Sequence, residues 1–135
     1  MQFNFNCEQI LGCNNEGFAI LEGSFPKAVK PGHTLYVNEI LDSMGYLSSK
    51  VKNIYNQKAQ CLNTVITSSQ KFFLSNHRIF MKARDNSVIG YIKVGTKKLF
   101  VRDHLANYYE ITPLCVLDFY VHDSQQRGGH GKVNK

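Results

Sequence analysis

Residues 113–132 read P-L-C-V-L-D-F-Y-V-H-D-S-Q-Q-R-G-G-H-G-K. The first part, Pro113–Val121, is the most apolar run of the chain, and the last part, Gln126–Lys132, has the pattern Q-x-x-G-x-G. A strand that runs into a glycine-bearing turn presents a row of backbone N–H groups to an anion. Glycine suits such a turn because a Cβ would block the close approach of a diphosphate. This stretch therefore predicts a buried strand followed by an anion-binding turn.

The first half of the chain predicts one strand and one long helix. Phe18–Leu21 is a short apolar run bounded by glycines, which favours a strand. Residues 25–33 contain two prolines and a glycine and predict a loop. From Thr34, taken as the N-cap, apolar residues recur at steps of three and four, which predicts a helix to Ile54 that Gly45 could bend or split. The members of this apolar stripe are Val37, Ile40, Leu41, Met44, Leu47, Val51 and Ile54.

Beyond this helix the apolar period becomes that of strands. Residues 58–69 are polar and mixed, which leaves a loop or a second short helix open. Strands are predicted at residues 78–82, 88–95 and 99–101, with a turn at 85–87 and a polar loop at 102–110. Ile111–Val121 has apolar residues on both faces, which is typical of a central strand. We expect Val88–Val94 to flank this strand and the helix to pack on the resulting sheet.

Composition and charge exclude several classes of protein. The 135 residues are 43% hydrophobic with a net charge of +6, which fits one globular domain that favours acidic partners. No apolar stretch approaches the roughly 20 residues of a membrane helix, and the N-terminus lacks a signal-peptide pattern. We therefore expect no membrane partner. The scattered cysteines, Cys7, Cys13, Cys61 and Cys115, lack C-x-x-C spacing, so neither a disulfide framework nor a metal site is expected.

Several stretches together carry a resemblance to a known family. They are residues 1–5, M-Q-F-N-F; Gln60-x-Leu62 ahead of Ile66-Thr67-Ser68; residues 88–101, V-I-G-Y-I-K-V-G-T-K-K-L-F-V; residues 113–122; and the turn 126–132. This set closely resembles the α-tubulin N-acetyltransferases, a divergent branch of the GNAT-type acetyltransferase superfamily. The glycine turn alone indicates only an acyl-CoA enzyme. The run I-K-V-G-x-K-K-L-F narrows the resemblance to the acetyltransferases that act on tubulin. The likeness is strong over residues 78–132 and weaker over residues 1–58.

The resemblance implies a fold and a co-substrate. The fold is α/β, a GNAT-type acyl-CoA N-acyltransferase domain with a mixed sheet and a flanking helix, of which residues 1–135 form one N-terminal part. The co-substrate is acetyl-CoA, without a metal. Strand N–H and C=O groups near Phe119 and Val121 would hold the pantetheine arm and polarise the thioester carbonyl. The CoA-contacting segment of the family falls on Phe119, Tyr120, Val121, His122, Asp123, Ser124, Gln125, Gln126, Arg127, Gly128, Gly129, His130, Gly131 and Lys132.

The implied reaction moves an acetyl group to a lumenal lysine of α-tubulin, on microtubules in the cytoplasm, with cilia as one location. The lysine amine must be neutral to attack. Gln60 matches a glutamine regarded as crucial for catalysis in the family. Its amide cannot act as a base, so it would position the amine or a water. The segment before Gln60 is longer than in the family. An alternative alignment register therefore places Lys52 or Gln57 at the position of the family glutamine. Leu62 and residues 66–68 match the family only in the register that places Gln60 there.

Four further side chains have two readings each. Lys97 and Lys98 are candidates to contact the acidic surface of tubulin, or they form an ordinary solvated turn. Cys115 resembles a family cysteine near the active site, but a cysteine on an apolar strand is usually part of the core. Asp118 interrupts an apolar run and needs a buried partner, so we expect a structural pairing ahead of a role as a base.

Two rival functions remain open at this point. One is a catalytically inactive chain that acts only as a tubulin-binding module. The other, nucleic-acid binding, depends on charge alone, because basic residues are spread from Lys27 to Lys135 without a basic helix or stacking motif. We therefore expect no nucleic-acid partner.

The resemblance also implies that the family's next helix, its further strands and its catalytic aspartate lie beyond residue 135. Such a helix would cover apolar side chains worth about 1.5–3 kcal/mol each, and the strands would cover an open sheet edge. We accordingly expect the 135-residue chain, expressed alone, to be aggregation-prone and to acetylate tubulin poorly.

Overall fold

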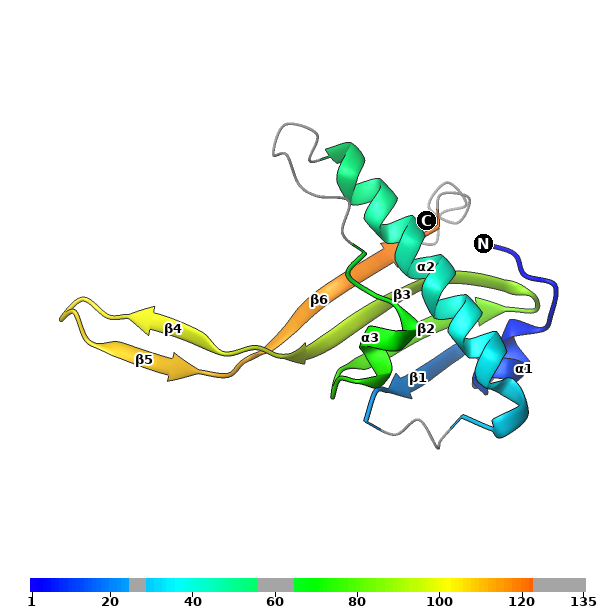
Figure 1. Cartoon of the computed structure of the whole chain (residues 1–135), viewed down its shortest axis with the longest axis horizontal. Coiled ribbons are helices and arrows are strands. Elements are labelled where there is room, and N and C mark those ends of the chain that lie inside the picture. The colour runs from blue at the N-terminus through cyan, green and yellow to red at the C-terminus, as the bar shows by residue number, and fades with distance from the viewer. Residues whose placement is uncertain (25–28, 56–64, 123–135) are drawn as a thin grey trace.

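A computed structural model describes residues 1–24, 29–55 and 65–122. The elements, in chain order, are α1 (Cys7–Leu11), β1 (Phe18–Glu22), the 3-10 turn η2 (Pro31–His33), α2 (Thr34–Tyr55), α3 (Ser69–Phe73), β2 (Arg78–Arg84), β3 (Ser87–Thr96), β4 (Leu99–Arg102), β5 (Tyr108–Ile111) and β6 (Leu114–Val121). The long helix α2 lies across one face of a sheet, and the β4–β5 hairpin projects away from that sheet (Figure 1).

The sheet confirms the predicted α/β arrangement. Its four strands follow the order β1-β2-β3-β6, and each neighbouring pair is antiparallel, so the described strands do not form the mixed sheet that was expected. The strands predicted at 18–21, 78–82 and 88–95 correspond to β1, β2 and β3. Side chains alternate between the two faces of a strand, and one face of this sheet packs against α2. The buried core on that face includes Ala19, Leu21, Ile79, Met81, Tyr91 and Tyr120.

Helix α2 forms as its apolar stripe predicts. The stripe residues from Val37 to Met44 are buried, and Leu47 and Val51 are half-buried against the core. Gly45 does not split the helix, which is continuous to Tyr55.

The predicted start of α2 is wrong in one detail, because Thr34 is not an N-cap. It has right-handed helical dihedrals (φ −56°, ψ −47°) and directly follows η2. Pro31 opens that turn, and its fixed φ suits the first helical position. The chain therefore already follows a helical path when it reaches Thr34.

The prediction of a central strand at Ile111–Val121 is wrong for the described sheet. β3 does flank this segment, but β6 begins at Leu114 and is an edge strand among the described residues. Phe119 is 59% exposed on the face away from α2. A two-sided apolar pattern indicates that both faces of a strand are apolar, but it carries no information about which strands lie beside it.

The predicted loop at residues 102–110 is also wrong, since Tyr108–Ile111 pairs with β4 as a hairpin. Asp103 closes the hairpin turn by accepting hydrogen bonds from the backbone N–H groups of Leu105 and Asn107 (both 2.9 Å) and from the Tyr109 hydroxyl (2.6 Å). Every residue of β4 and β5 is exposed. The local turn, rather than burial, therefore supports this hairpin.

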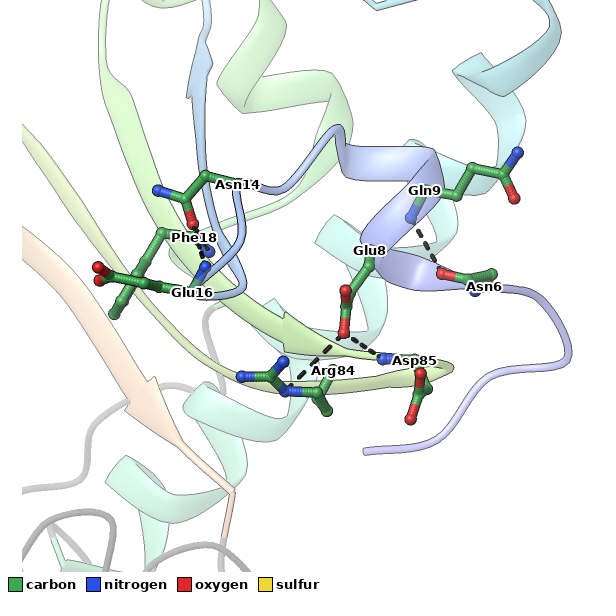
Figure 2. A network of polar contacts seen from close by, with 8 residues as sticks. All are labelled: Asn6, Glu8, Gln9, Asn14, Glu16, Phe18, Arg84 and Asp85. Carbon is green, nitrogen blue, oxygen red and sulfur yellow. Dashed lines mark hydrogen bonds and ion pairs between the residues drawn. The ribbon is translucent and has the colours of Figure 1, made fainter.

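The N-terminal segment is anchored to the β2–β3 turn. The Asn6 side chain caps α1 by accepting a hydrogen bond from the N–H of Gln9 (3.0 Å). Glu8 on α1 accepts a hydrogen bond from the N–H of Asp85 (2.7 Å) and lies 3.9 Å from the Arg84 guanidinium (Figure 2). Cys7 on α1 is fully buried, and burial raises the pKa of its thiol to about 12. Cys7 is therefore a core residue with little thiolate at neutral pH.

The close approach of α2 to residues 65–68 predicts the effect of one substitution. A Cβ at Gly45 would overlap the carbonyl oxygen of Thr67. Overpacking typically costs about 1–3 kcal/mol, and a rigid backbone neighbour places this case at the upper end. We expect Gly45→Ala to lower the free energy of unfolding in urea, because the ~1 kcal/mol gained in helix propensity does not offset the overlap.

Gly32→Ala is the matched control, since a Cβ at Gly32 would meet no atom of the described residues within 4 Å. Its urea midpoint should stay close to that of the unsubstituted chain. Equal stability of the two variants would contradict the packing described here.

Candidate active site

The predicted CoA-contacting residues begin at the C-terminal end of β6. Phe119, Tyr120 and Val121 are the last residues of this strand, and His122 follows it. Tyr120 is buried toward α2, whereas Phe119 and Val121 are exposed on the opposite face. The other predicted residues, Gln60 and Asp123, Ser124, Gln125, Gln126, Arg127, Gly128, Gly129, His130, Gly131 and Lys132, lie outside the described residues.

The register of β6 shows which way its peptide groups point. The N–H of His122 donates a hydrogen bond to the carbonyl oxygen of Ile89 on β3 (2.8 Å). Because the direction of the peptide groups alternates along a strand, the N–H and C=O groups of Phe119 and Val121 point away from β3. They face the outer edge of the described sheet.

A one-residue bulge in β6 directs two consecutive side chains toward α2. Lys93 on β3 pairs with Asp118, and Val94 pairs with Val116, so Leu117 has no partner opposite. Asp118 is 2% exposed, and the Leu117 side chain lies over Gly95 on the same face. In a regular strand these neighbours would face opposite sides. The bulge therefore places a carboxylate inside the domain, next to Phe119.

The Asp118 carboxylate is the centre of a buried polar cluster with Ser48, Thr67 and Tyr91. Its Oδ2 accepts hydrogen bonds from the hydroxyls of Thr67 and Tyr91 (both 2.6 Å). Its Oδ1 accepts from the Ser48 hydroxyl (2.9 Å) and from the N–H of Phe119 (3.0 Å). Burial, and then the hydrogen bond to Asp118, raise the pKa of Tyr91. The phenol therefore remains a donor at neutral pH, and the expected structural pairing of Asp118 is confirmed.

A second buried polar side chain, Lys93, fixes the same region. Its ammonium group is 3.2 Å from the carbonyl oxygen of Ile66, and the residue is 4% exposed. Burial, and then the charge of Lys93, lower the pKa of His77. The segment that leads into α3 is thus held by a hydrogen bond from Lys93 at Ile66 and by the Asp118 carboxylate at Thr67.

Sequence reasoning missed the other members of these clusters, although a signal was present. Ser48 lies on the apolar stripe of α2, four residues after Met44. Lys93 and Asp118 each interrupt an apolar strand, and the register pairs them. A polar residue at a core position needs a buried partner, so three such interruptions indicate a polar cluster where the helix crosses the sheet.

The two predicted substrate-contacting lysines lie at the base of the projecting hairpin. Lys97 and Lys98 connect β3 to β4 and are exposed, and the ammonium group of Lys98 is 3.5 Å from Glu110. Cys115, at the start of β6, is half-exposed, with its Sγ 3.6 Å from the carbonyl oxygen of Pro113.

In the described ranges, no three His, Cys, Asp or Glu side chains gather into a group that could hold a metal ion. In the same part of the chain, every helix is too short or too polar to cross a membrane.

The Asp118 cluster predicts a stability difference between two similar tyrosines. Tyr91→Phe removes a buried hydrogen bond to a carboxylate, which typically contributes about 1.5–3 kcal/mol. We expect a loss of stability of that order in urea unfolding. Tyr109→Phe removes a bond of the same length, 2.6 Å, to Asp103 in the exposed hairpin turn, and should change the urea midpoint little. If Tyr109→Phe proved the more damaging change, the Asp118 cluster would not be a main support of the fold.

The sequence of this chain is similar to those of several known proteins. The family model described as GNAT acetyltransferase, Mec-17, matches residues 4–133. An alpha-tubulin N-acetyltransferase of Trichoplax adhaerens is 44% identical over 100 residues, which are 70% of this chain and 42% of that protein. Proteins of the same name from Tetrahymena thermophila and Aedes aegypti are 36% and 35% identical over 98% of this chain, and it covers 32% and 49% of their lengths.

The chain thus spans between a third and a half of the length of these relatives. The match confirms the GNAT-type fold that the resemblance implied, and it covers the described sheet, α2 and the segment of the glycine turn. The chain belongs to the Mec-17 family of GNAT acetyltransferases.

Proposed function

We propose that this protein is an α-tubulin N-acetyltransferase, which transfers the acetyl group of acetyl-CoA to a lumenal lysine of α-tubulin in microtubules. The observation that carries the proposal is the match of residues 4–133 to the Mec-17 family. The alpha-tubulin N-acetyltransferases of Trichoplax, Tetrahymena and Aedes support the choice of substrate. The protein would accordingly act on microtubules in the cytoplasm.

Membership of the GNAT family implies acetyl-CoA as the acetyl donor. The described end of β6 suits this donor, because the N–H and C=O groups of Phe119 and Val121 point to the outer edge of the sheet. The pantetheine arm carries two amides, and the Phe119 N–H would have to give up its hydrogen bond to Asp118 Oδ1 (3.0 Å) to pair with one of them. Residues 122–132 would then bind the diphosphate through the amides of the glycine turn.

The acceptor side of the reaction requires a neutral lysine amine close to the thioester. We assign Gln60 to its orientation, because a carboxamide can both accept and donate a hydrogen bond but cannot take up a proton at neutral pH. Lys97 and Lys98 are proposed to contact the acidic surface of tubulin. Their exposure at the base of a hairpin that projects from the sheet supports this assignment.

The reaction is tested with assembled microtubules, acetyl-CoA and a chain extended through the family's next helix and catalytic aspartate, with the 135-residue chain, which is expected to acetylate poorly, measured beside it. Mass spectrometry should find acetyl groups on one lumenal lysine of α-tubulin, and the Tetrahymena relative serves as the positive control. CoA without the acetyl group is the negative control. Acetylation scattered over many exposed tubulin lysines would contradict the assigned substrate site. Cosedimentation with microtubules without any transfer would instead support the alternative, a tubulin-binding module.

The role of Gln60 is tested by separating turnover from donor affinity. Misplacing a reacting group by about 1 Å can cost on the order of 10²-fold in rate. In a full-length context that includes the family's next helix and catalytic aspartate, Gln60→Ala should therefore lower kcat strongly, while the Kd for acetyl-CoA changes little. Gln57→Ala is the matched control, because it tests the alternative register. A loss confined to Gln57→Ala would move the role to that residue, and an equal loss of turnover and affinity in Gln60→Ala would indicate a folding role.

A further inference from the structure

The outer edge of β1 carries backbone groups that the ladder of the sheet does not use. β1 pairs with β2 on one side, and the register begins with Phe18. The carbonyl oxygen of Gly17 accepts a hydrogen bond from the N–H of Ala83 on β2 (2.8 Å). At the other end, the N–H of Gly23 donates to the carbonyl oxygen of His77 (2.9 Å). Since the direction of the peptide groups alternates along a strand, the even-numbered residues of β1 point their N–H and C=O groups away from β2.

Phe18, the first of these even-numbered residues, already has a partner on the outer side. Asn14 accepts a hydrogen bond from the N–H of Phe18 at its Oδ1 (3.0 Å), and its own N–H donates to the carbonyl oxygen of Phe18 (2.8 Å) (Figure 2). Asn14 thus takes the place of a neighbouring strand at this point. None of the described residues forms a hydrogen bond with the outward N–H or C=O groups of Ile20 and Glu22. The open stretch of the edge therefore runs from Ile20 to Glu22.

A cavity of about 410 Å³ opens beside this stretch, and all three of its residues line it. Its wall also includes the buried side chains of Leu11 and Val37, so it lies on the face of the sheet that α2 covers. A cavity of this size is within the range of ligand-binding pockets, about 300–1,000 Å³. It is therefore large enough for one large apolar side chain, and it is open next to unused backbone groups.

The charges around the cavity favour an acidic ligand. Lys30 and His33, which precede α2, both line the cavity, and neither is paired with a carboxylate of the described residues. Glu22 also lines it, but its carboxylate lies 3.2 Å from the Arg78 guanidinium, which compensates its charge. Lys30 therefore adds a positive charge at the rim, and the His33 imidazole adds a hydrogen-bond donor.

An extended peptide is the ligand that matches these three features. Its N–H and C=O groups can pair with those of Ile20 and Glu22, as when a peptide adds a strand to the edge of a sheet. In an antiparallel pairing, the residue opposite Leu21 directs its side chain to the same face as Leu21. This is the face on which the cavity opens. The peptide residues two positions before and after this anchor point to the same face, where Lys30 and His33 favour acidic side chains.

We propose that the outer edge of β1 from Ile20 to Glu22, together with this cavity, binds an extended segment of a partner protein. The segment adds an antiparallel strand to β1, places one large apolar side chain in the cavity and carries acidic residues two positions to either side of it. The site lies at the opposite edge of the described sheet from β6. It therefore does not depend on the proposed acetyl transfer.

The test measures the binding of a synthetic peptide, Glu-Thr-Phe-Val-Glu, with capped ends and a fluorescent label, by fluorescence anisotropy. The protein is the extended chain of the acetylation assay. Replacing the phenylalanine of the peptide by alanine removes the side chain that enters the cavity. N-methylation of its threonine and valine removes the N–H groups that would donate to the carbonyl oxygens of Glu22 and Ile20. Each change should weaken binding by at least about tenfold, the equivalent of ~1.4 kcal/mol.

Two substitutions in the protein act on the two halves of the site. Ile20→Pro removes the outward N–H group and leaves the ladder to β2 intact, because an edge strand tolerates proline where its nitrogen faces outward. Val29→Phe keeps β1 unchanged and fills the cavity from its wall. Each should lower the affinity for the peptide by at least about tenfold, a loss of ~1.4 kcal/mol.

A matched pair of charge reversals tests the acidic preference. Lys30→Glu should weaken peptide binding, because it places a negative charge at the rim of the cavity. Lys50→Glu makes the same change at an exposed residue about 20 Å beyond Val37 along α2. It should leave the affinity unchanged.

Hydrogen exchange followed by NMR locates the peptide on the protein. The amide hydrogens of Ile20 and Glu22 should exchange quickly in the free protein and slowly once the peptide is bound. The amides of Ala19 and Leu21 face β2 and are the internal controls, since their exchange should change little.

A lack of binding would overturn the proposal, and so would binding that the phenylalanine and N-methyl changes leave unaltered, because charge attraction alone would explain it. Slowed exchange elsewhere, with Ile20 and Glu22 unaffected, would place the peptide at another site and have the same consequence. Self-association of the chain that Ile20→Pro abolishes, without peptide binding, would assign this edge to a second copy instead. Peptide binding by a chain that transfers no acetyl group would support this inference and refute only the proposed function.

Discussion

The buried carboxylate of Asp118 is the interaction on which the arrangement of this domain depends. Removing a carboxylate from water costs several kcal/mol unless its oxygens are satisfied. Here the donors come from α2, from the segment before α3 and from β3. α2, the segment before α3 and β3 must therefore keep their relative positions for the buried carboxylate of Asp118 to stay hydrogen-bonded. Gly45 contributes to the same arrangement, because the absence of a side chain there lets α2 approach Thr67.

The two faces of the sheet differ in a way that bears on function. The face toward α2 holds the core and the polar cluster. On the other face, the register aligns Ile20, Phe80, Ile92 and Phe119 in one row across all four strands. These side chains are 39–59% exposed. An apolar row of this kind explains why the sequence around Phe119 has the pattern of a strand covered on both sides, although only one side is covered within the described residues.

The polar cluster also gives a physical reason for a charged residue inside an apolar strand. The Asp118 carboxylate, buried beneath β6, accepts hydrogen bonds from the hydroxyls of Ser48, Thr67 and Tyr91 and from the N–H of Phe119. These donors satisfy the hydrogen-bonding capacity that burial would otherwise leave unmet.

The sequence by itself determined the helix α2, the strands β1, β2 and β3, and the family, because these depend on local periodicity and on motifs that can be read along the chain. It also indicated that Asp118 needed a buried partner. Only the tertiary structure decided which partners it has, because the bulge at Leu117 is a shift of one residue between two strands and leaves no local pattern. The pairing of β4 with β5 and the edge position of β6 were not predicted for the same reason. Pairing joins residues that are distant in the chain, and hydrophobic alternation specifies the faces of a strand but not its neighbours.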